Sequence, residues 1–456
     1  MGLSGDFDPA WLWLPGIPGY FPPLDLAFES LLSLSSGWTL EPGLARFEIS
    51  PEATTITFTL KADTFWQSGE PLTASYAATF LELAFSPEHH GPLSSKSALL
   101  KGIKVHDERT FTVHLNEPDC SSLTDMGLLR LTYPPPFPSL PSPEKLKGTG
   151  PFVIARWGKD EIVLESSGTQ ASPFQRIRFR RFGTGEEVIE AYRAGEIGAF
   201  ILNPGGIALP KDLIAGRILS PDLYFIAFNL RNQALEDPRV RMALTMAVPR
   251  EELLREVLGG EGVLAGGPFL PGYLPEEPAP PPFNPERAVE ILKESGWGDE
   301  DGDGFLEKDG EPFRLRILTN GESRTREQIA LRVVKSYRAI GIDAELNVVE
   351  FGNFLEALFG GYFEAAVFSV PLGPDPDLTP FFSAGGIFNF SGFSDQEVEE
   401  LLREGIKVPG CNPEIRRGIY SRLASRLNEL KPWDFLFFPF TLMGPEGLFR
   451  VLPAAS

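Results

Sequence analysis

The chain has 456 residues, 42% of them hydrophobic and 23% charged, and its formal net charge is −21 at pH 7. This length fits about three units of ~150 residues with a large buried core. The negative charge argues against nucleic acid or an anionic membrane as a main partner, because both require clustered Lys and Arg.

The sequence predicts neither a membrane span nor a targeting segment. No apolar run reaches about 18 residues, and the opening MGLSGDFDPAWLW has no basic stretch followed by an apolar one. We therefore expect a cytosolic protein or one whose targeting segment was removed. The many prolines and few Met and Cys are typical of thermophile proteins, although GC-rich coding produces part of the same bias.

Predicted strands dominate the first part of the chain. The run TTITFTL alternates apolar and polar residues and predicts a strand, which a helix capped by Thr73 or Ser75 follows. The segment KGIKVHDERTFTVHL predicts a hairpin, and FVIARW and IVLES predict two further strands. We therefore expect residues 43–170 to form a mainly β unit.

After residue 170 the predicted strands and helices alternate. The expected strands include YFIAFNL, FRLRILTNG, AAVFSV and FLFFPFTL. The expected helices include DPRVRMALTMAV, capped by Asp237, and NPERAVEILKESG, capped by Asn284. The pattern predicts an α/β or mixed chain with an inserted β-rich unit.

Motifs of common catalysts are missing. The sequence has no GxSxG, no P-loop and no CxxC, and its four histidines are scattered without zinc-type spacing. The helix-opening GTGEE at 183–187 lacks the third glycine and the context of a dinucleotide loop. We therefore expect a binding protein without a cofactor.

One acidic stretch, DEDGDGFLEKDGE, matches part of a calcium loop. Asp299, Asp301 and Asp303 stand at the first, third and fifth ligand positions, and Gly304 stands at the sixth. The twelfth position, where a bidentate Glu belongs, is Gly310. An Asp/Gly turn without a metal explains the same residues, and we prefer it while the calcium interpretation stays open.

Several stretches match one protein family in the right order. They are FDPA, AFESLL, LEPGLARFEISPEATTITFTLKADTFWQSGEPLTASY, KGTGPF, FNLRNQALEDPRVRMALTMAVPREELL and GPDPDLTPFF. On these residues the chain resembles the extracytoplasmic solute-binding proteins of ABC transporters, specifically the peptide/nickel-binding family 5. The match covers nearly the whole chain. Members usually have a first strand before the FDPA-like turn, and with only MGLSG there we expect that strand to be truncated or the chain to be a shortened relative.

The resemblance implies an α/β, periplasmic-binding-protein-like type II fold, with two lobes joined by a hinge and an inserted β-rich domain. We expect lobe one to comprise residues 1–42, 171–252 and 434–456, the inserted domain residues 43–170, and lobe two residues 253–433. The resemblance also implies a monomer at the periplasm or cell surface. It would enclose a ligand between its lobes, without catalysis, and deliver it to an ABC-transporter permease.

By the same resemblance, the loop AVFSVPLGPDPDLTP lies at the ligand cleft. The backbone of Phe368, Ser369 and Val370 is expected to pair with an extended peptide, as an added strand would. Trp13 falls in the family's first cleft loop, and Asn229 falls at a polar cleft position.

The loop departs from the pattern of peptide binders at one place. There, a carboxylate three positions before the acidic–Pro pair holds the ligand's α-amino group. Here the pair is Asp375–Pro376, and Leu372 stands at the anchor position. Asp375 or Asp377 is the available substitute, though with different spacing. If Leu372 faces the cleft, Leu372→Asp should improve the binding of peptides with a free amino terminus.

The resemblance leaves the ligand open. An oligopeptide ranks first on family frequency, an oligosaccharide is the alternative, and nickel or a metal chelate ranks third. A cytosolic ligand sensor or a hydrolase on the same fold is the alternative class. Because Cys120 and Cys411 fall in different expected domains, we predict that they are not bridged, since a bond would tie the inserted domain to the moving lobe.

Overall fold

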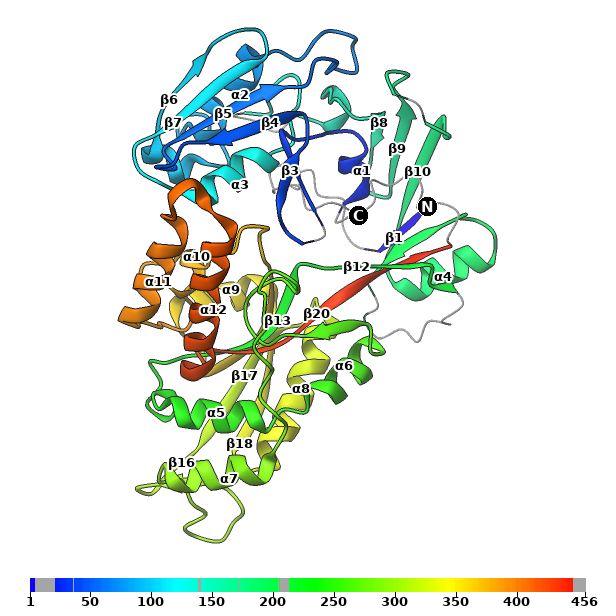
Figure 1. Ribbon diagram of the computed structural model, residues 1–456. Helices are drawn as coiled ribbons and strands as arrows, with labels where there is room; N and C mark the ends of the chain where they lie inside the picture. Colours follow the sequence, from blue (N-terminus) through cyan, green and yellow to red (C-terminus); the bar gives the residue numbers. More distant parts are fainter. Residues whose placement is uncertain are drawn as a thin grey trace.

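The protein is described by a computed structural model that covers residues 1–4, 21–35, 37–137, 141–170, 172–203, 205 and 213–445. A large mixed sheet runs through it (Figure 1), with twelve strands in these residues. Its order is β18-β17-β19-β13-β20-β11-β1-β10-β9-β8, and β12 and β14 pair with β20. The strands are β1 (Gly2–Ser4), β8 (Phe152–Trp157), β9 (Glu161–Ser166), β10 (Arg176–Phe182), β11 (Phe200–Leu202), β12 (Gly216–Leu219), β13 (Asp222–Phe228), β14 (Gly262–Leu264), β17 (Arg314–Asn320), β18 (Asp343–Val349), β19 (Ala365–Pro371) and β20 (Trp433–Gly444).

Strand β20 joins the two halves of this sheet. Its first half pairs with β13, and its second half pairs with β11 and β12. The run WDFLFFPFTLMG is buried over most of its length, which fits a strand covered on both faces. By strand pairing, we name the part around β1 and β8–β12 lobe one, and the part around β13, β14 and β17–β19 lobe two.

Lobe two packs helices on both faces of its sheet. Alternate side chains of β13 explain this arrangement, because Ile226 and Phe228 enter one core while Phe225 and Ala227 enter the other. The helices of the first core are α5 (Pro238–Met246), α6 (Arg250–Leu258), α7 (Pro285–Glu294) and α8 (Arg324–Arg338). Those of the second are α9 (Phe351–Gly360), α10 (Thr379–Phe382), α11 (Gln396–Ile406) and α12 (Pro413–Leu430).

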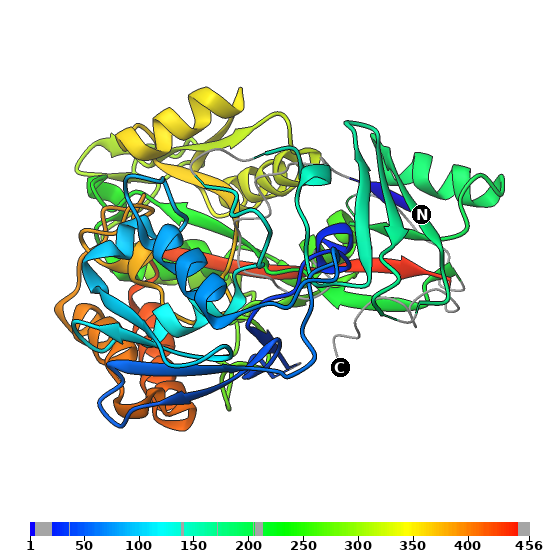
Figure 2. The same ribbon diagram turned by 90° about the horizontal axis from the view of Figure 1, so that it is seen from above.

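A separate sheet of order β4-β5-β7-β6 forms the small domain, which we define as residues 31–131. Its elements are β2 (Leu32–Leu34), β3 (Leu40–Pro42), β4 (Ala45–Ile49), β5 (Thr55–Leu60), β6 (Leu100–Val105), β7 (Thr110–Leu115), α2 (Ala74–Phe85), η2 (Ser94–Leu99) and α3 (Cys120–Leu128). Figure 2 shows this domain lying over lobe two, with lobe one to its side.

The remaining short elements lie within these parts or between them. They are α1 (Pro22–Asp25), η3 (Pro143–Lys145), α4 (Gly185–Arg193), η5 (Gln233–Leu235), β15 (Glu307–Lys308), β16 (Glu311–Pro312) and η6 (Pro409–Cys411). Within the described ranges, no helix combines the length and the apolarity needed to cross a membrane.

The structure differs from the sequence-based expectations in how some elements group. β8 and β9 lie in the range expected for the β-rich unit, but they pair in the large sheet, where β9 is the neighbour of β10. Similarly, β13 and α5 were expected in lobe one but pack in lobe two. Alternation of apolar and polar residues predicts that a segment forms a strand but not which strand it pairs with. The sequence pattern therefore could not predict how the strands group into sheets. The boundaries of independently moving bodies remain a prediction.

The residues before FDPA form a short first strand, β1. β1 pairs in parallel with β10 and with β11, so three residues suffice to fill the gap between those two strands. The predicted helix caps are confirmed at Thr73, Asp237 and Asn284, whose side chains each accept a backbone N–H of the first helical turn.

Candidate functional site

A cavity of about 170 Å³ lies between the small domain and lobe two. The small domain lines it with Leu34, Trp38, Thr39, Leu40, Phe47, Ile49, Cys120, Leu123 and Thr124. Lobe two lines it with Tyr273, Pro374, Asp375, Pro376, Gly410, Cys411, Pro413, Arg416 and Arg417. The 374–376 stretch thus lies at the interface of the small domain and lobe two.

Asp375 is committed to an ion pair inside this interface. Arg416 of α12 donates to both of its carboxylate oxygens at 2.9 and 2.8 Å, and Thr124 Oγ1 of α3 donates to it at 2.9 Å. Burial alone would raise the pKa of Asp375, but the charge and hydrogen bonds of Arg416 hold it below its usual range. Asp375 is therefore not available as a substitute anchor for a ligand ammonium.

Leu372 lies in the core of lobe two. Its side chain is 4% exposed and packs among the aromatic and aliphatic residues of the second core, and its backbone N–H donates to Pro221 O at 3.0 Å. Leu372 therefore does not face the cleft, and Leu372→Asp would not place a carboxylate where it could hold a ligand's amino group.

We expect Leu372→Asp to lower the free energy of unfolding by about 2–4 kcal/mol, because it buries an unpaired carboxylate in place of an apolar side chain. Urea unfolding at pH 7 measures this loss. Leu372→Met, which keeps the volume, should stay within about 1.5 kcal/mol of the parent. Equal stability of the Asp variant and the parent would contradict the burial of this side chain.

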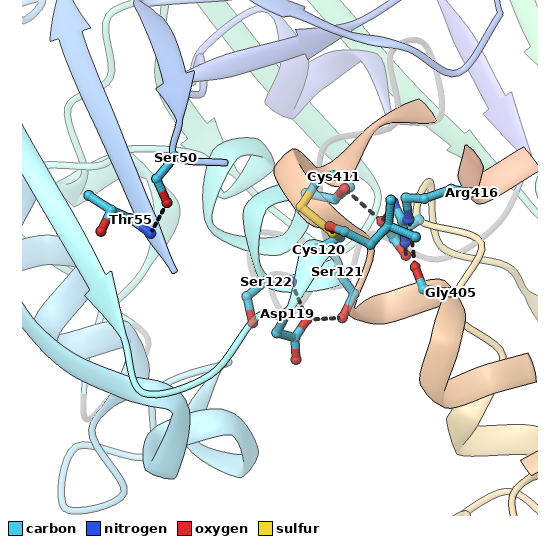
Figure 3. Close-up of a disulfide and its surroundings, with 12 residues drawn as sticks. Ser50, Thr55, Asp119, Cys120, Ser121, Ser122, Gly405, Cys411 and Arg416 are labelled. Atoms are coloured by element: carbon cyan, nitrogen blue, oxygen red, sulfur yellow. Dashed lines mark hydrogen bonds and ion pairs between the residues drawn. A yellow bond between two sulfur atoms is a disulfide. The ribbon is translucent and has the colours of Figure 1, made fainter. Parts of the chain in front are cut away.

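The expectation that Cys120 and Cys411 are free is wrong. The two residues form a disulfide, and their Cα atoms are 5.4 Å apart. Neither residue is therefore a free cysteine. Figure 3 shows the bond joining the first residue of α3 to the turn that precedes α12. The residues do fall in the small domain and in lobe two, as expected, but these two parts meet there, so distance along the chain did not predict distance in space.

Further contacts join the same two parts around the disulfide. Trp38 Nε1 donates to Pro271 O at 2.9 Å, and Lys407 Nζ lies 2.6 Å from a carboxylate oxygen of Glu117. On α3, Asp119 caps the helix by accepting from Ser122 N and Ser121 Oγ (Figure 3). The small domain and lobe two are thus in direct contact along this edge.

The residues Phe368, Ser369 and Val370 lie on β19, inside the sheet of lobe two. On one side they pair with β13 in an unbroken register. On the other side the ladder with β17 covers only Ala365 and Ala366. Within the described residues, no strand pairs with this second side of residues 368–370.

Arg326, in the first turn of α8, lies over this part of β19. Its Cζ is 5.0 Å from the centre of the Phe368 ring, and its Nε is buried without a hydrogen-bond partner. Burial lowers the pKa of Arg326, against the attraction of Tyr224, Asp222 and Glu322. Thr325 beside it approaches Gly205 of lobe one, which places this turn at the boundary between the lobes.

The other predicted binding residues do not join this site. Asn229 is 4% exposed. Its side-chain amide donates to Gly361 O at 2.9 Å and to Phe363 O at 2.7 Å, so it links the end of β13 to the segment that precedes β19. Trp13 lies outside the described residues.

The calcium-like stretch is an exposed turn whose carboxylates bind its own backbone. Asp299 accepts from Gly302 N and Gly304 N, and Asp301 accepts from Asp303 N. Asp299, Asp301 and Glu307 each place a carboxylate oxygen within 4.8 Å of the others. Exposed acidic groups adopt such turns without a metal, so the turn interpretation accounts for all of these contacts.

Sequence patterns missed Arg416 and Arg326, although a signal for both was present. Each arginine lies on the buried stripe of its helix, Arg416 with Tyr420 and Leu427, and Arg326 with Ile329 and Val333. A lone arginine in line with apolar residues at helical spacing indicates a buried or partly buried cation.

The chain matches one family of known proteins over most of its length. The family is described as "Bacterial extracellular solute-binding proteins, family 5 Middle", and the match covers residues 39–389. The oligopeptide-binding protein AppA of Bacillus subtilis is 26% identical over 325 residues, which are 66% of this chain and 58% of that protein. The nickel-binding periplasmic protein of Escherichia coli is 23% identical over 433 residues, 89% of this chain and 82% of that one.

Solved structures share the fold. AppA of Bacillus subtilis in complex with a nonapeptide superimposes with a TM-score of 0.76 at 20% identity, covering 98% of this chain and 94% of that one. NikA of Brucella suis in complex with Fe(III)-EDTA gives a TM-score of 0.81 at 20% identity, covering 98% and 95%. These likenesses confirm the expected two-lobed α/β architecture.

Proposed function

Because this chain belongs to the bacterial extracellular solute-binding proteins of family 5, we propose that it captures an oligopeptide between its lobes and delivers it to an ABC-transporter permease. The family consists of non-enzymatic solute-binding proteins, which sets the hydrolase alternative aside. The chain would act as a monomer outside the cytoplasm. The sensor alternative would keep the same site but lack a permease partner.

The observation that carries the peptide proposal is the open edge of β19. The ladder with β17 ends at Ala366, so the backbone of residues 368–370 has one side without a strand partner in the described part of the chain. An extended peptide can add to such an edge through its own backbone, with affinity from main-chain hydrogen bonds. An oligosaccharide lacks the alternating N–H and C=O groups that would match it.

Arg326 favours a cargo that carries a carboxylate. Its buried Nε has no partner in the described residues, and a buried guanidinium gains most from a charge-assisted hydrogen bond. Asp375 is paired with Arg416 and Leu372 is buried, so neither position offers a free carboxylate to a ligand ammonium. We therefore propose a peptide whose carboxylate, and not its amino terminus, is fixed by charge.

Native mass spectrometry of the protein purified from its source tests the cargo. We expect bound peptides, released on denaturation. Recovery of oligosaccharides or a metal chelate as the main species would refute the peptide proposal. Steady release of cleaved product from a peptide library would refute the assignment as a binding protein.

We expect Arg326→Gln to weaken the binding of a peptide with a free C-terminal carboxylate by about tenfold to a hundredfold, the scale of one charge-assisted hydrogen bond. The same peptide with a C-terminal amide should bind the parent and the variant alike. Isothermal titration calorimetry of this matched pair measures both effects.

Arg324→Gln is the matched control, because Arg324 lies two residues before Arg326 in the first turn of α8 but is exposed. It should leave both affinities unchanged. An equal loss for the acid and the amide in Arg326→Gln would show that Arg326 acts on the shape of the site and not on ligand charge.

A further inference from the structure

We propose that the Cys120–Cys411 bond is a clasp that keeps one edge of the interlobe cleft closed and leaves the lobes a single rotation by which to exchange cargo. The inference about cargo rests on the proposed capture function, whereas the restriction on movement follows from the structure alone. The bond joins α3 of the small domain to η6, the turn that precedes α12 in lobe two (Figure 3).

The small domain is fastened to lobe one, so it cannot swing freely with lobe two. Gln67 Nε2 donates to the backbone oxygens of Ala27, Gly150 and Phe152, at 3.0, 3.1 and 2.6 Å. Arg130 and Asp25 form an ion pair at 2.7 Å in which both side chains are less than a tenth exposed. A buried pair of this kind breaks only at high cost, which makes the small domain and lobe one one body.

The chain connections between lobes lie away from the clasp. Strand β20 and the segment from β12 to β13 cross between the lobes, and Figures 1 and 2 both show this crossing on the side of lobe one, with α3 and α12 at the opposite side. The two bodies are therefore joined at two separate places, one by the crossing strands and one by the disulfide.

Two attachments restrict the movement that one hinge would permit. The Cα atoms of bridged cysteines remain within about 7 Å of each other, so α3 and the start of α12 cannot separate while the bond is intact. A body held at two places keeps rotation about the line through them. The lobes can then open only by turning about the line from the clasp to the crossing strands, and not by spreading apart at the clasp edge.

Without the bond, only noncovalent contacts would hold this edge. The Glu117–Lys407 pair is about half exposed, and such pairs contribute at most about 1 kcal/mol. The Trp38–Pro271 hydrogen bond adds a similar amount. The Thr124–Asp375 bond would also break, but Asp375 would keep Arg416. The disulfide therefore decides whether the edge opens.

The test compares the unliganded oxidised protein with the Cys120→Ser/Cys411→Ser variant. We expect the variant to have a larger radius of gyration by small-angle scattering. Amides of residues 120–128 and 413–420 should exchange hydrogen about tenfold faster or more, because opening exposes both helix starts. Amides of β17 and β18 in the lobe-two core should exchange at unchanged rates, which separates opening of the edge from global unfolding.

The parent protein provides a second route if the variant fails to fold. Dithiothreitol reduces the bond in the folded protein: the S–S bond takes up two electrons and two protons to give two thiols, and the dithiol becomes its cyclic disulfide. Blocking the thiols with iodoacetamide should reproduce the faster exchange. Dithiothreitol added to the double-serine variant is the control and should change nothing.

Identical scattering and identical exchange of residues 120–128 with and without the bond would overturn the clasp. This outcome is separate from failure of the proposed function, which would appear as absence of bound peptide whatever the state of the bond. If the clasp holds, peptide release from the double-serine variant should be about tenfold faster than from the oxidised protein, since an additional route of opening becomes available.

Discussion

Arg416→Met is expected to lower the free energy of unfolding by about 3–5 kcal/mol at pH 7, the cost of removing one partner of a buried ion pair. Arg416 and Asp375 are 9% and 7% exposed, so little solvent replaces the lost charge. Methionine keeps much of the apolar stem but leaves the Asp375 carboxylate with Thr124 Oγ1 and the backbone N–H of Asp377 as its hydrogen-bond donors. Urea unfolding at pH 7 measures the loss.

A control on the same helix separates burial from loss of charge in general. Arg422 pairs with Glu404 at 3.5 Å, and both side chains are more than half exposed. Arg422→Met should therefore cost no more than about 1 kcal/mol. Equal losses in the two variants would contradict the buried character of the Arg416–Asp375 pair.

The dependence on pH provides a second readout with a definite sign. In the parent, the pKa of Asp375 is lowered on folding, so its contribution is complete above the unfolded value of about 3.9 and is lost as the pH falls through the lower, folded value. In Arg416→Met, burial without the paired guanidinium should raise that pKa against the weaker opposing effect of Lys96, so acidification from pH 7 should stabilise this carboxyl group. The difference in stability between parent and variant should therefore shrink from pH 7 to pH 4.

Local sequence patterns predicted most elements of the fold. TTITFTL corresponds to β5, and the caps at Asp237 and Asn284 begin α5 and α7 as expected. These predictions succeed because alternation and capping depend on neighbours a few residues apart. Strand pairing depends on distant residues, which is why β8 and β9 were placed with the wrong sheet.

The candidate site was harder to predict for the same reason. Neither the partner of Asp375 nor the Cys120–Cys411 bond follows from local pattern, because both join elements far apart in the chain. The helical stripe that contains Arg416 indicates that it is buried, but not which carboxylate it meets.

The same stripe pattern identifies Arg250 in α6, in line with Leu253, Leu254 and Val257. Arg250 is 3% exposed and pairs with Asp434, the second residue of β20, which is 1% exposed. The guanidinium also donates to the backbone oxygens of Thr245, Val248, Pro281 and Phe435, at distances of 3.0 to 3.3 Å. One side chain thus joins α5, α6, the proline-rich segment and β20.

We expect Arg250→Met to lower the free energy of unfolding by about 4 kcal/mol, and Asp434→Asn to lower it by no more than about 2 kcal/mol. The difference arises because the first change leaves the buried Asp434 carboxylate without its guanidinium partner and removes the hydrogen bonds of Arg250 to four backbone oxygens. The second removes the counter-charge of Arg250 but keeps a side-chain oxygen that can accept its hydrogen bond. Burial already raises the pKa of Asp434, although Arg250 and Lys431 oppose this, so the neutral form is tolerated there. Urea unfolding at pH 7 measures both losses.

Arg255→Met is the matched control, since Arg255 is exposed one turn further along α6 and should cost no more than about 1 kcal/mol. The sign of the pH effect provides an independent check. Because folding raises the pKa of Asp434, its contribution weakens as the pH rises from the unfolded value towards the folded one, and Asp434→Asn should abolish that slope. Equal losses of unfolding free energy in Arg250→Met and Asp434→Asn would contradict this interpretation. They would show that the charge of the pair, and not the hydrogen bonds of Arg250 to backbone oxygens, stabilises the first residues of β20.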